Sequence, residues 1–195
     1  PLPTDNATDE QELILGCQQE RAKAQETLYK RYYSYGMSIT LRYAYSREEA
    51  SEILNDGFLK VFQNIHSYDA NRSFKSWFRK ILINTAIDYY RINKKHYFKT
   101  DLESAPTISY DEDILDSLNV EDIFKLLNKL KKSYRLVFNL YEIEGYSHEE
   151  IGKMLDTAAG TSRSLLTRAK KQLRKLYKEE FENTYVRSIR PTYFA

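Results

Sequence analysis

The stretch at 144–176, EGYSHEEIGKMLDTAAGTSRSLLTRAKKQLRKL, constrains the fold more than any other part of the chain. Ser147 can cap the N-terminus of a helix, and Glu150, three positions later, completes the pattern of a capping box. Ile151 and Leu155 follow one helical turn apart, as residues on a buried face do. The first half of the stretch therefore predicts a short helix with a well-defined start.

A tight break and a second, strongly basic helix follow. The break spans 156–159, and Gly160-Thr161 opens the next helix. A core stripe recurs at helical spacing: Leu166, Ala169, Leu173 and Leu176. Seven basic residues and no acid lie between 160 and 178: Arg163, Arg168, Lys170, Lys171, Arg174, Lys175 and Lys178. A basic run alone is commonly a solvated face. After a capped helix and a short break, it indicates a helix-turn-helix that places its second helix in DNA.

Composition points to an all-α fold, and the length allows one or two small helical domains. The 195 residues include only six Gly and four Pro, and helical periodicity dominates the chain. Hydrophobic content of 42% and charged content of 30% are typical of a soluble globular protein, which we expect in the cytoplasm. No apolar run is long enough to span a membrane and no signal-peptide pattern opens the sequence, so no membrane partner is expected.

Metal, redox and enzymatic chemistry find little support in the sequence. Cys17 is the one cysteine, so it cannot form an internal disulfide, and we expect a buried structural thiol. The three histidines, His66, His96 and His148, are far apart and show no metal-ligand spacing. We therefore predict no metal, no cofactor and no enzyme.

A first helical block is predicted at 10–95, after a polar N-terminus at 1–9 that we expect to be disordered. One apolar stripe consists of Leu28, Tyr32, Tyr35, Ile39 and Tyr43. A second helix starts with another capping-box pattern at Ser46 and Glu49, and its stripe is Ala50, Ile53, Leu54, Gly57, Phe58, Val61, Phe62 and Ile65. Gly57 costs about 1 kcal/mol of helix propensity relative to Ala, which is tolerable if another helix packs closely there.

The last helix of this block is predicted at 73–93, after a turn at 68–71. Its buried side is Phe74, Phe78, Ile81, Leu82 and Thr85. Its other side carries Lys80, Asn84, Asp88 and Arg91, with Lys75, Trp77 and Arg79 near its start. Nine basic and two acidic residues lie between 60 and 99 among many aromatics, which suits single-stranded nucleic acid because bases stack on rings while cations hold phosphates. Trp77 fits a core position and a nucleic-acid contact equally well.

An acidic linker is predicted at 96–119. Eight acids and no Lys or Arg lie between 101 and 122, and Pro106 opposes a packed helix over most of this segment. Two interpretations stay open: an inert solvated spacer, or a segment that occupies a basic channel in a partner. A second helical block at 120–180 contains the helix-turn-helix, and the tail at 181–195 has no readable periodicity.

The two motifs together resemble a known family. SFKSWFRKILINTAIDYYR, the acidic linker and EGYSHEEIGKML…GTSRSLLTRAKKQL are similar to the extracytoplasmic-function (ECF) sigma factors of bacterial RNA polymerase, group 4 of the sigma-70 family. The resemblance covers about residues 10–178, with two separate motifs in the right order. It implies sigma region 2 at 10–95 and sigma region 4 at 120–180. It further implies binding to core RNA polymerase and promoter DNA, recognition of the −35 and −10 elements, promoter melting and transcription initiation.

The resemblance also implies roles by position. The helix at 46–64 matches the one that docks on the clamp region of the largest polymerase subunit, and region 4 would meet the flap region of the second. The implied polymerase-binding residues are Glu52, Asn55, Asp56, Leu59 and Gln63. Those implied for the −10 element and melting are Tyr68, Asp69, Asn71, Arg72, Lys75, Trp77, Lys80, Asn84 and Arg91. Those implied for the −35 element are Thr161, Ser162, Arg163, Ser164, Leu165, Arg168 and Lys171. An anti-sigma factor or another recruiting factor is a further partner that the resemblance allows.

The sequence departs from the family pattern around the second helix of region 4. Leu165 stands where relatives often carry a polar or basic side chain, and Asp156, Thr157 and Ala159 replace commoner residues of the break. Leucine can touch a thymine methyl but cannot hydrogen-bond a base edge. We therefore expect weaker or altered −35 reading. Footprints that depend strictly on the −35 sequence and are unchanged by Leu165→Ala would contradict this expectation.

Two other functions compete with this interpretation. A free-standing helix-turn-helix transcription regulator would bind duplex DNA without polymerase and would not need the Trp77 region. A DNA recombinase is suggested by the seventeen Tyr residues. Such an enzyme needs Arg and His groups that converge on a nucleophilic Tyr, and the three His show no such pattern.

Overall fold

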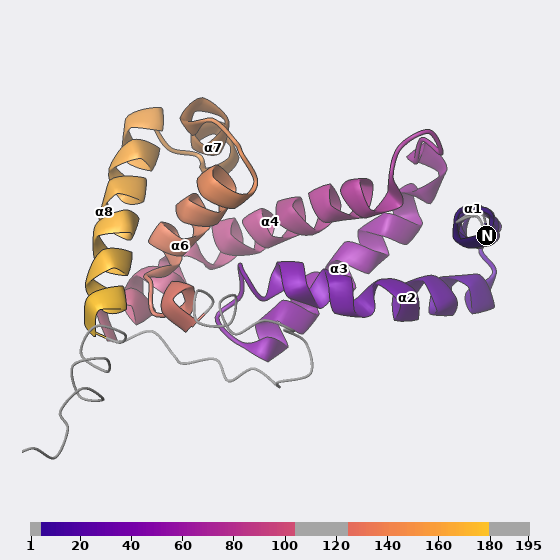
Figure 1. Ribbon diagram of the computed structural model, residues 1–195, viewed down its shortest axis with the longest axis horizontal. Coiled ribbons are helices and arrows are strands. Elements are labelled where there is room, and N and C mark those ends of the chain that lie inside the picture. Colours follow the sequence, from indigo (N-terminus) through magenta and orange to yellow (C-terminus); the bar gives the residue numbers. More distant parts are fainter. Residues whose placement is uncertain (1–4, 104–124, 180–195) are drawn as a thin grey trace, which may run out of the picture. The chain divides into compact units, whose positions relative to one another are not determined.

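The computed structural model describes residues 5–103 and 125–179, and the chain divides into two compact units, Pro1–Asn93 and Lys94–Ala195. Within the described ranges the chain forms helices and short connections, with no β-strand (Figure 1). This confirms the all-α class. The predictions for 104–119, for 120–124 and for the tail at 181–195 lie outside the described residues.

Unit 1 contains α1 (Asp5–Gln18), α2 (Ala22–Thr40), α3 (Arg47–Asn64), the single 3₁₀ turn η1 (Ile65–Ser67) and the start of α4 (Phe74–Glu103). Consecutive helices α1, α2 and α3 pack on one another, and α1 also packs on η1. This unit follows the predicted order of helices and turns.

The N-terminal helix begins earlier than predicted. The expectation of disorder at 1–9 is wrong for Asp5–Asp9, which form the first turns of α1. Arg31 of α2 forms an ion pair with Asp9, and the hydroxyl of Tyr32 donates to the Glu10 carboxylate. Because polar contacts with α2 hold this polar segment, apolar periodicity could not predict the helix.

The helix α4 also extends further than predicted, to Glu103. The linker prediction is therefore wrong for residues 96–103. No Gly or Pro occurs between Phe74 and Glu103, so no residue in this segment breaks the backbone hydrogen bonding of the helix. The first proline beyond it is Pro106, which had suggested an earlier end.

Aromatic rings dominate the core of unit 1. Phe58, Phe74 and Phe78 are fully buried, and the rings of Phe58 and Phe78 lie 4.7 Å apart. All the predicted stripe residues are buried except Tyr35, Phe62 and Ile81, which are half-buried. The requirement for close packing at Gly57 is met, because a Cβ there would lie 2.4 Å from Cδ2 of Leu82 on α4.

Capping of α3 follows the prediction in part. The Ser46 hydroxyl accepts a hydrogen bond from the backbone N–H of Glu49 at 3.1 Å. The Glu49 carboxylate, however, accepts from the backbone N–H of Tyr45 at 2.8 Å. The reciprocal bond thus goes to the residue before the cap, and it still satisfies a backbone donor at the entry to the helix.

Unit 2 continues with a helical segment at 125–128, then α6 (Lys132–Phe138), a short π-helix η3 (Asn139–Ile143), α7 (His148–Leu155) and α8 (Ala159–Tyr177). Both α6 and α7 pack against α8 (Figure 1). The apolar cluster beneath α8 includes Leu127, Leu130, Tyr134, Phe138, Ala169, Leu173 and Leu176. The predicted core stripe of the second helix is therefore confirmed.

The helix-turn-helix forms as predicted, with α8 starting one residue early at Ala159. The capping box on α7 is complete: the Ser147 hydroxyl accepts from the Glu150 N–H at 3.2 Å, and the Glu150 carboxylate accepts from the Ser147 N–H at 2.8 Å. The backbone N–H and the hydroxyl of Ser147 both donate to the Glu150 carboxylate, and these two bonds lower the pKa of Glu150. The helix α7 ends at Asp156, whose φ of 51° lies in the left-handed region that favours glycine.

Candidate nucleic-acid interface

The loop at 68–73 is held in shape by its own polar groups. The Asp69 carboxylate accepts hydrogen bonds from the backbone N–H and the side-chain amide of Asn71, both at 3.0 Å. The backbone N–H of Arg72 donates to the Asp69 carbonyl at 2.9 Å, and the Tyr68 hydroxyl donates to the Arg72 carbonyl. Asp69, Asn71 and Arg72 are exposed, so the loop presents a preformed polar surface.

Aromatic rings connect this loop to α4. The ring of Tyr68 lies 5.2 Å from that of Trp77 and 5.7 Å from that of the buried Phe74. Trp77 is half-buried, so it packs on the core and keeps part of its surface in solvent. Burial raises the pKa of Tyr68, which keeps its hydroxyl protonated and able to donate.

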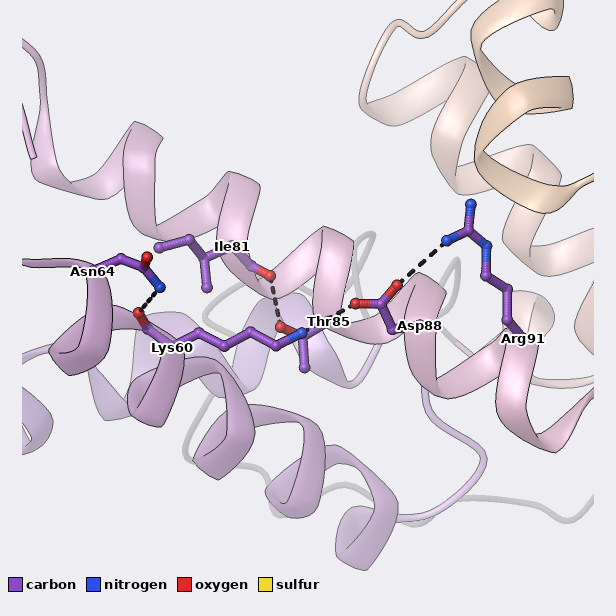
Figure 2. Close-up of polar contacts among 6 residues, drawn as sticks. All are labelled: Lys60, Asn64, Ile81, Thr85, Asp88 and Arg91. Carbon is purple, nitrogen blue, oxygen red and sulfur yellow. Dashed lines mark hydrogen bonds and ion pairs between the residues drawn. The ribbon is translucent and has the colours of Figure 1, made fainter. Parts of the chain in front are cut away.

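The polar side of α4 presents three of the predicted contacts to solvent, namely Lys80, Asn84 and Arg91. Asp88 lies between them and forms ion pairs with Arg91 at 3.4 Å and with Lys60 of α3 at 3.1 Å (Figure 2). The predicted contact Lys75 is exposed, with its ammonium 5.6 Å from the centre of the Tyr35 ring.

Lys60 was missed as a member of this surface. It lies on α3, and the helical pattern gave no reason to connect it with α4, which is distant in sequence. Its side chain reaches from α3 to Asp88 (Figure 2). Gly57, three residues earlier, indicated that some helix packs closely there but not which one, so no sequence signal related Lys60 to Asp88.

The predicted polymerase-binding stripe on α3 is exposed along its length, at Glu52, Asn55, Asp56, Leu59 and Gln63. Leu59 exposes 58% of its surface, so it places an apolar side chain within this otherwise polar stripe. The Tyr29 hydroxyl donates to Asn55 at 3.0 Å and the Tyr89 hydroxyl donates to Glu52 at 2.7 Å. The hydrogen bond to Glu52 and burial raise the pKa of Tyr89 to about 12.

Ser162 does not belong to the predicted −35 surface. It is fully buried, and its hydroxyl lies 2.9 Å from Nδ1 of His148 at the start of α7. The His148 ring stacks on Tyr141 at 4.3 Å. Ser162 therefore joins the two helices of the helix-turn-helix and faces away from any DNA that α8 would contact.

The other predicted contacts on α8 are exposed, except that Leu165 is half-buried. Arg163 forms an ion pair with Glu149 of α7 at 2.6 Å, and Lys170 forms one with Glu142 at 2.6 Å. Arg168 and Lys171 have no ion-pair partner among residues 5–103 and 125–179. Their charges are therefore directly available to an anionic ligand.

The described part of the chain contains neither a metal site nor a membrane-spanning helix. No group of three or more His, Cys, Asp or Glu there could hold a metal ion, and no helix there is both long and apolar enough to cross a membrane. Cys17 is buried, and burial raises its pKa to about 11, which agrees with the predicted structural thiol.

Family models match both units. The model for Sigma-70 region 2 matches residues 28–96, and the model for Sigma-70, region 4 matches residues 121–173. The class of protein is thus a two-domain sigma-70 factor, with the aromatic and basic face of α4 in region 2 and the helix-turn-helix in region 4.

Curated relatives narrow the class. The ECF RNA polymerase sigma factor SigW of Bacillus subtilis is 33% identical over 140 residues, which cover 65% of this chain and 74% of SigW. The ECF RNA polymerase sigma-E factor of Haemophilus influenzae is 26% identical over 176 residues, 84% of this chain and 93% of the relative. The chain therefore belongs to the ECF sigma factors. It is an RNA polymerase-binding sigma factor that directs promoter recognition and transcription initiation, and it is not an enzyme.

A solved structure shares the fold. The sigma factor RpoE of Bartonella quintana, crystallised in complex with the anti-sigma factor NepR, is 21% identical, with a TM-score of 0.51. The match covers 80% of this chain and 97% of that one. A known sigma factor thus adopts the same helical fold.

Proposed function

We propose that this sigma factor contacts a promoter at two places, through different chemistry in each unit. Unit 1 binds the −10 element and its opened strand with the loop at 68–73 and the polar side of α4. Unit 2 reads the −35 element in the major groove with α8. Because transcription takes place beside the chromosome, we place the protein in the bacterial cytoplasm.

The observation that carries the proposal is that the polar side of α4 directly follows the loop at 68–73, whose shape is held by its own hydrogen bonds. Lys80 and Asn84 are exposed on the helix, and Trp77 offers a partly exposed ring at its start. Cations, an amide and a ring on one surface can hold phosphates, pair with a base edge and stack on a base. A protein that reads only duplex DNA has no use for the stacking ring.

The proposed contact with polymerase lies on the outer side of α3. We propose that Glu52, Asn55, Asp56, Leu59 and Gln63 dock on the clamp region of the largest subunit, while region 4 meets the flap region of the second. The support is an exposed leucine among polar residues on a helix whose other side is buried. An apolar contact ringed by polar groups is the usual composition of a protein interface.

Gel shifts with and without core polymerase test the function as a whole. A sigma factor should bind a promoter fragment weakly alone and tightly with core enzyme. The rival, a free-standing helix-turn-helix regulator, predicts the same affinity in both cases. Tight, sequence-specific duplex binding by the protein alone, unchanged by core, would contradict our proposal.

The double variant Asp56→Arg with Leu59→Ala tests the polymerase contact. It reverses one charge and removes the exposed apolar side chain, so we expect core affinity to fall by about a hundredfold, or roughly 2–3 kcal/mol. Both residues are exposed, so circular dichroism should show an unchanged fold. The matched control is Glu26→Arg with Leu15→Ala, an exposed acid and an exposed leucine outside the stripe. Equal core binding by both double variants would remove the assignment.

A further inference from the structure

Asp88 is out of place on a surface that binds nucleic acid. Within 74–93 it is the one acidic residue of α4, and it lies in the same stripe as Lys80, Asn84 and Arg91. A carboxylate in this position repels the phosphates that the neighbouring cations attract. The contacts of Asp88 offer an explanation for its presence on this surface.

Each oxygen of Asp88 holds a different cation. Oδ2 lies 3.1 Å from Nζ of Lys60, and Oδ1 lies 3.4 Å from Nη1 of Arg91 (Figure 2). The polar neighbours bond within their own helices: the Thr85 hydroxyl donates to the Ile81 carbonyl at 2.8 Å, and the Asn64 amide donates to the Lys60 carbonyl at 2.8 Å. The Asp88 carboxylate therefore interacts with the two cations, Lys60 and Arg91, and not with these polar neighbours.

Stability alone is a weak reason for this arrangement. The side chains of Lys60, Asp88 and Arg91 are 39%, 49% and 44% exposed. Exposed ion pairs contribute little because water and salt screen them. The helices α3 and α4 are already joined by close apolar packing at Gly57 and Leu82. An effect on ligand binding is the better explanation.

We propose that Asp88 sets the specificity of the α4 surface by occupying the place of a phosphate between Lys60 and Arg91. Carboxylates and phosphates present similar oxygen acceptors to Lys and Arg. In the free protein Asp88 neutralises both cations and lowers affinity for arbitrary nucleic acid. When the holoenzyme holds an opened promoter strand here, a backbone phosphate displaces the carboxylate and contacts Lys60 and Arg91. This proposal rests on the proposed role of α4.

The proposal also separates two kinds of cation on the surface. Lys80 is exposed and has no ion-pair partner among the described residues, so it is accessible to a phosphate at all times. Lys60 becomes available only when Asp88 itself is displaced by a phosphate. The displacement of Asp88 therefore strengthens binding in the opened promoter complex, where the strand is held in register. It strengthens nonspecific binding of nucleic acid less.

The experiment measures binding of the free full-length chain to a fluorescent single-stranded DNA of mixed sequence over a series of salt concentrations. Asp88→Asn should raise affinity at low salt by about tenfold, and its salt slope should steepen by about 0.7, because Lys60 adds one phosphate contact and each such contact contributes about 0.7 on single strands. Asp88→Asn combined with Lys60→Gln should lose this added slope.

The matched control is Glu26→Gln. Glu26 of α2 also lies between two lysines, Lys23 at 3.2 Å and Lys30 at 2.5 Å, so this change removes the same charge from the same kind of arrangement. We expect little change in its affinity. An equal gain by Glu26→Gln and Asp88→Asn would show a bulk charge effect and overturn the proposal.

Further outcomes separate the remaining interpretations. An Asp88→Asn protein with wild-type affinity, or one that melts earlier without binding DNA more tightly, would show a structural ion pair and overturn the inference. If Lys80→Ala in the holoenzyme leaves promoter opening intact, the role of α4 itself fails. If Lys80→Ala impairs opening while Asp88→Asn has no effect on binding, the inference about Asp88 alone fails.

Discussion

The proposed nucleic-acid surfaces of the two units use different chemistry. The surface of unit 1 combines cations with an amide at Asn84 and with a partly exposed ring at Trp77. The surface of unit 2, on α8, offers the cations Arg163, Arg168 and Lys171, and its segment from Thr161 to Lys171 contains no aromatic ring. A ring is useful only where bases are unstacked, whereas Arg can read a paired base in the major groove. The difference agrees with our proposal that unit 1 holds the melted strand and unit 2 reads duplex DNA.

The two units also support their surfaces differently. In unit 1, α3 approaches a side chain of α4, since a Cβ on Gly57 would meet Cδ2 of Leu82. In unit 2, close approach is a contact with the backbone, since a Cβ on Gly152 would lie 2.8 Å from the carbonyl oxygen of Thr157. A side chain can rotate away, but the backbone of a two-helix turn cannot move without moving α8.

The largest expected effect is on open-complex formation, and it tests which unit opens DNA. Asn84→Ala or Lys80→Ala should reduce open-complex formation about tenfold or more while leaving core affinity unchanged, because each removes a group that meets the opened strand. Permanganate footprinting of unpaired thymines measures the opened state. Arg168→Ala should instead weaken binding to the closed promoter, by about 1–3 kcal/mol if Arg168 pairs with a guanine.

This comparison has its own control. On a promoter with a preformed bubble at −10, the Arg168→Ala defect should persist, because −35 reading still contributes to binding. The Asn84→Ala defect should persist too if the side chain contacts the single strand. Loss of core affinity in the Asn84→Ala or Lys80→Ala protein would place these residues on the polymerase contact instead.

The next largest effect is on stability, and it compares alanine substitutions at Gly152 and Gly57. Gly152→Ala should destabilise unit 2 by about 1–3 kcal/mol, because the new methyl group overpacks against the backbone of the turn. Both glycines lie inside helices, so alanine gains about 1 kcal/mol of helix propensity at each. Gly57→Ala should have a smaller net effect, because the Leu82 side chain can rotate away from the new methyl group. Denaturant unfolding of each variant, followed by circular dichroism, measures both.

Promoter-binding assays also distinguish the two glycine variants. Gly152→Ala should also weaken promoter binding, since it displaces the start of α8 relative to α7. A Gly152→Ala protein as stable as the wild type would show that the turn adjusts more easily than its backbone contact suggests, and the distinction between the units would be lost.

The smallest effect concerns pH and the tie between α4 and α3. With a pKa of about 12 in the folded protein, against an ordinary value of 10, protonated Tyr89 contributes stability that is fully present below pH 10 and is lost as pH rises through about 12. Glu52→Gln should let Tyr89 titrate at lower pH, because it removes the charge that opposes ionisation. The difference in phenolate absorbance between the wild type and Tyr89→Phe, measured in each background, reports this shift. An unchanged difference titration would show that the hydrogen bond to Glu52 does not control Tyr89.

Local patterns determined most of the fold in advance. The complete capping box at Ser147 and Glu150, the buried stripe of α3 and the core side of α8 are all as predicted, because they depend on residues within one or two turns of each other. The sequence by itself therefore established the all-α class, the helix-turn-helix and the sigma-factor family.

Only the tertiary structure decided which polar side chains are available for function. Ser162 lies among the predicted contacts of α8 but is buried against His148, because helical spacing defines a direction and the packing partner decides whether that direction is solvent. Lys60 and Asp88 meet across two helices, so no local pattern relates them. Helix length at α1 and α4 depended on tertiary contacts and on the absence of breakers. Contacts between residues distant in sequence follow from chain packing, which periodicity alone does not specify.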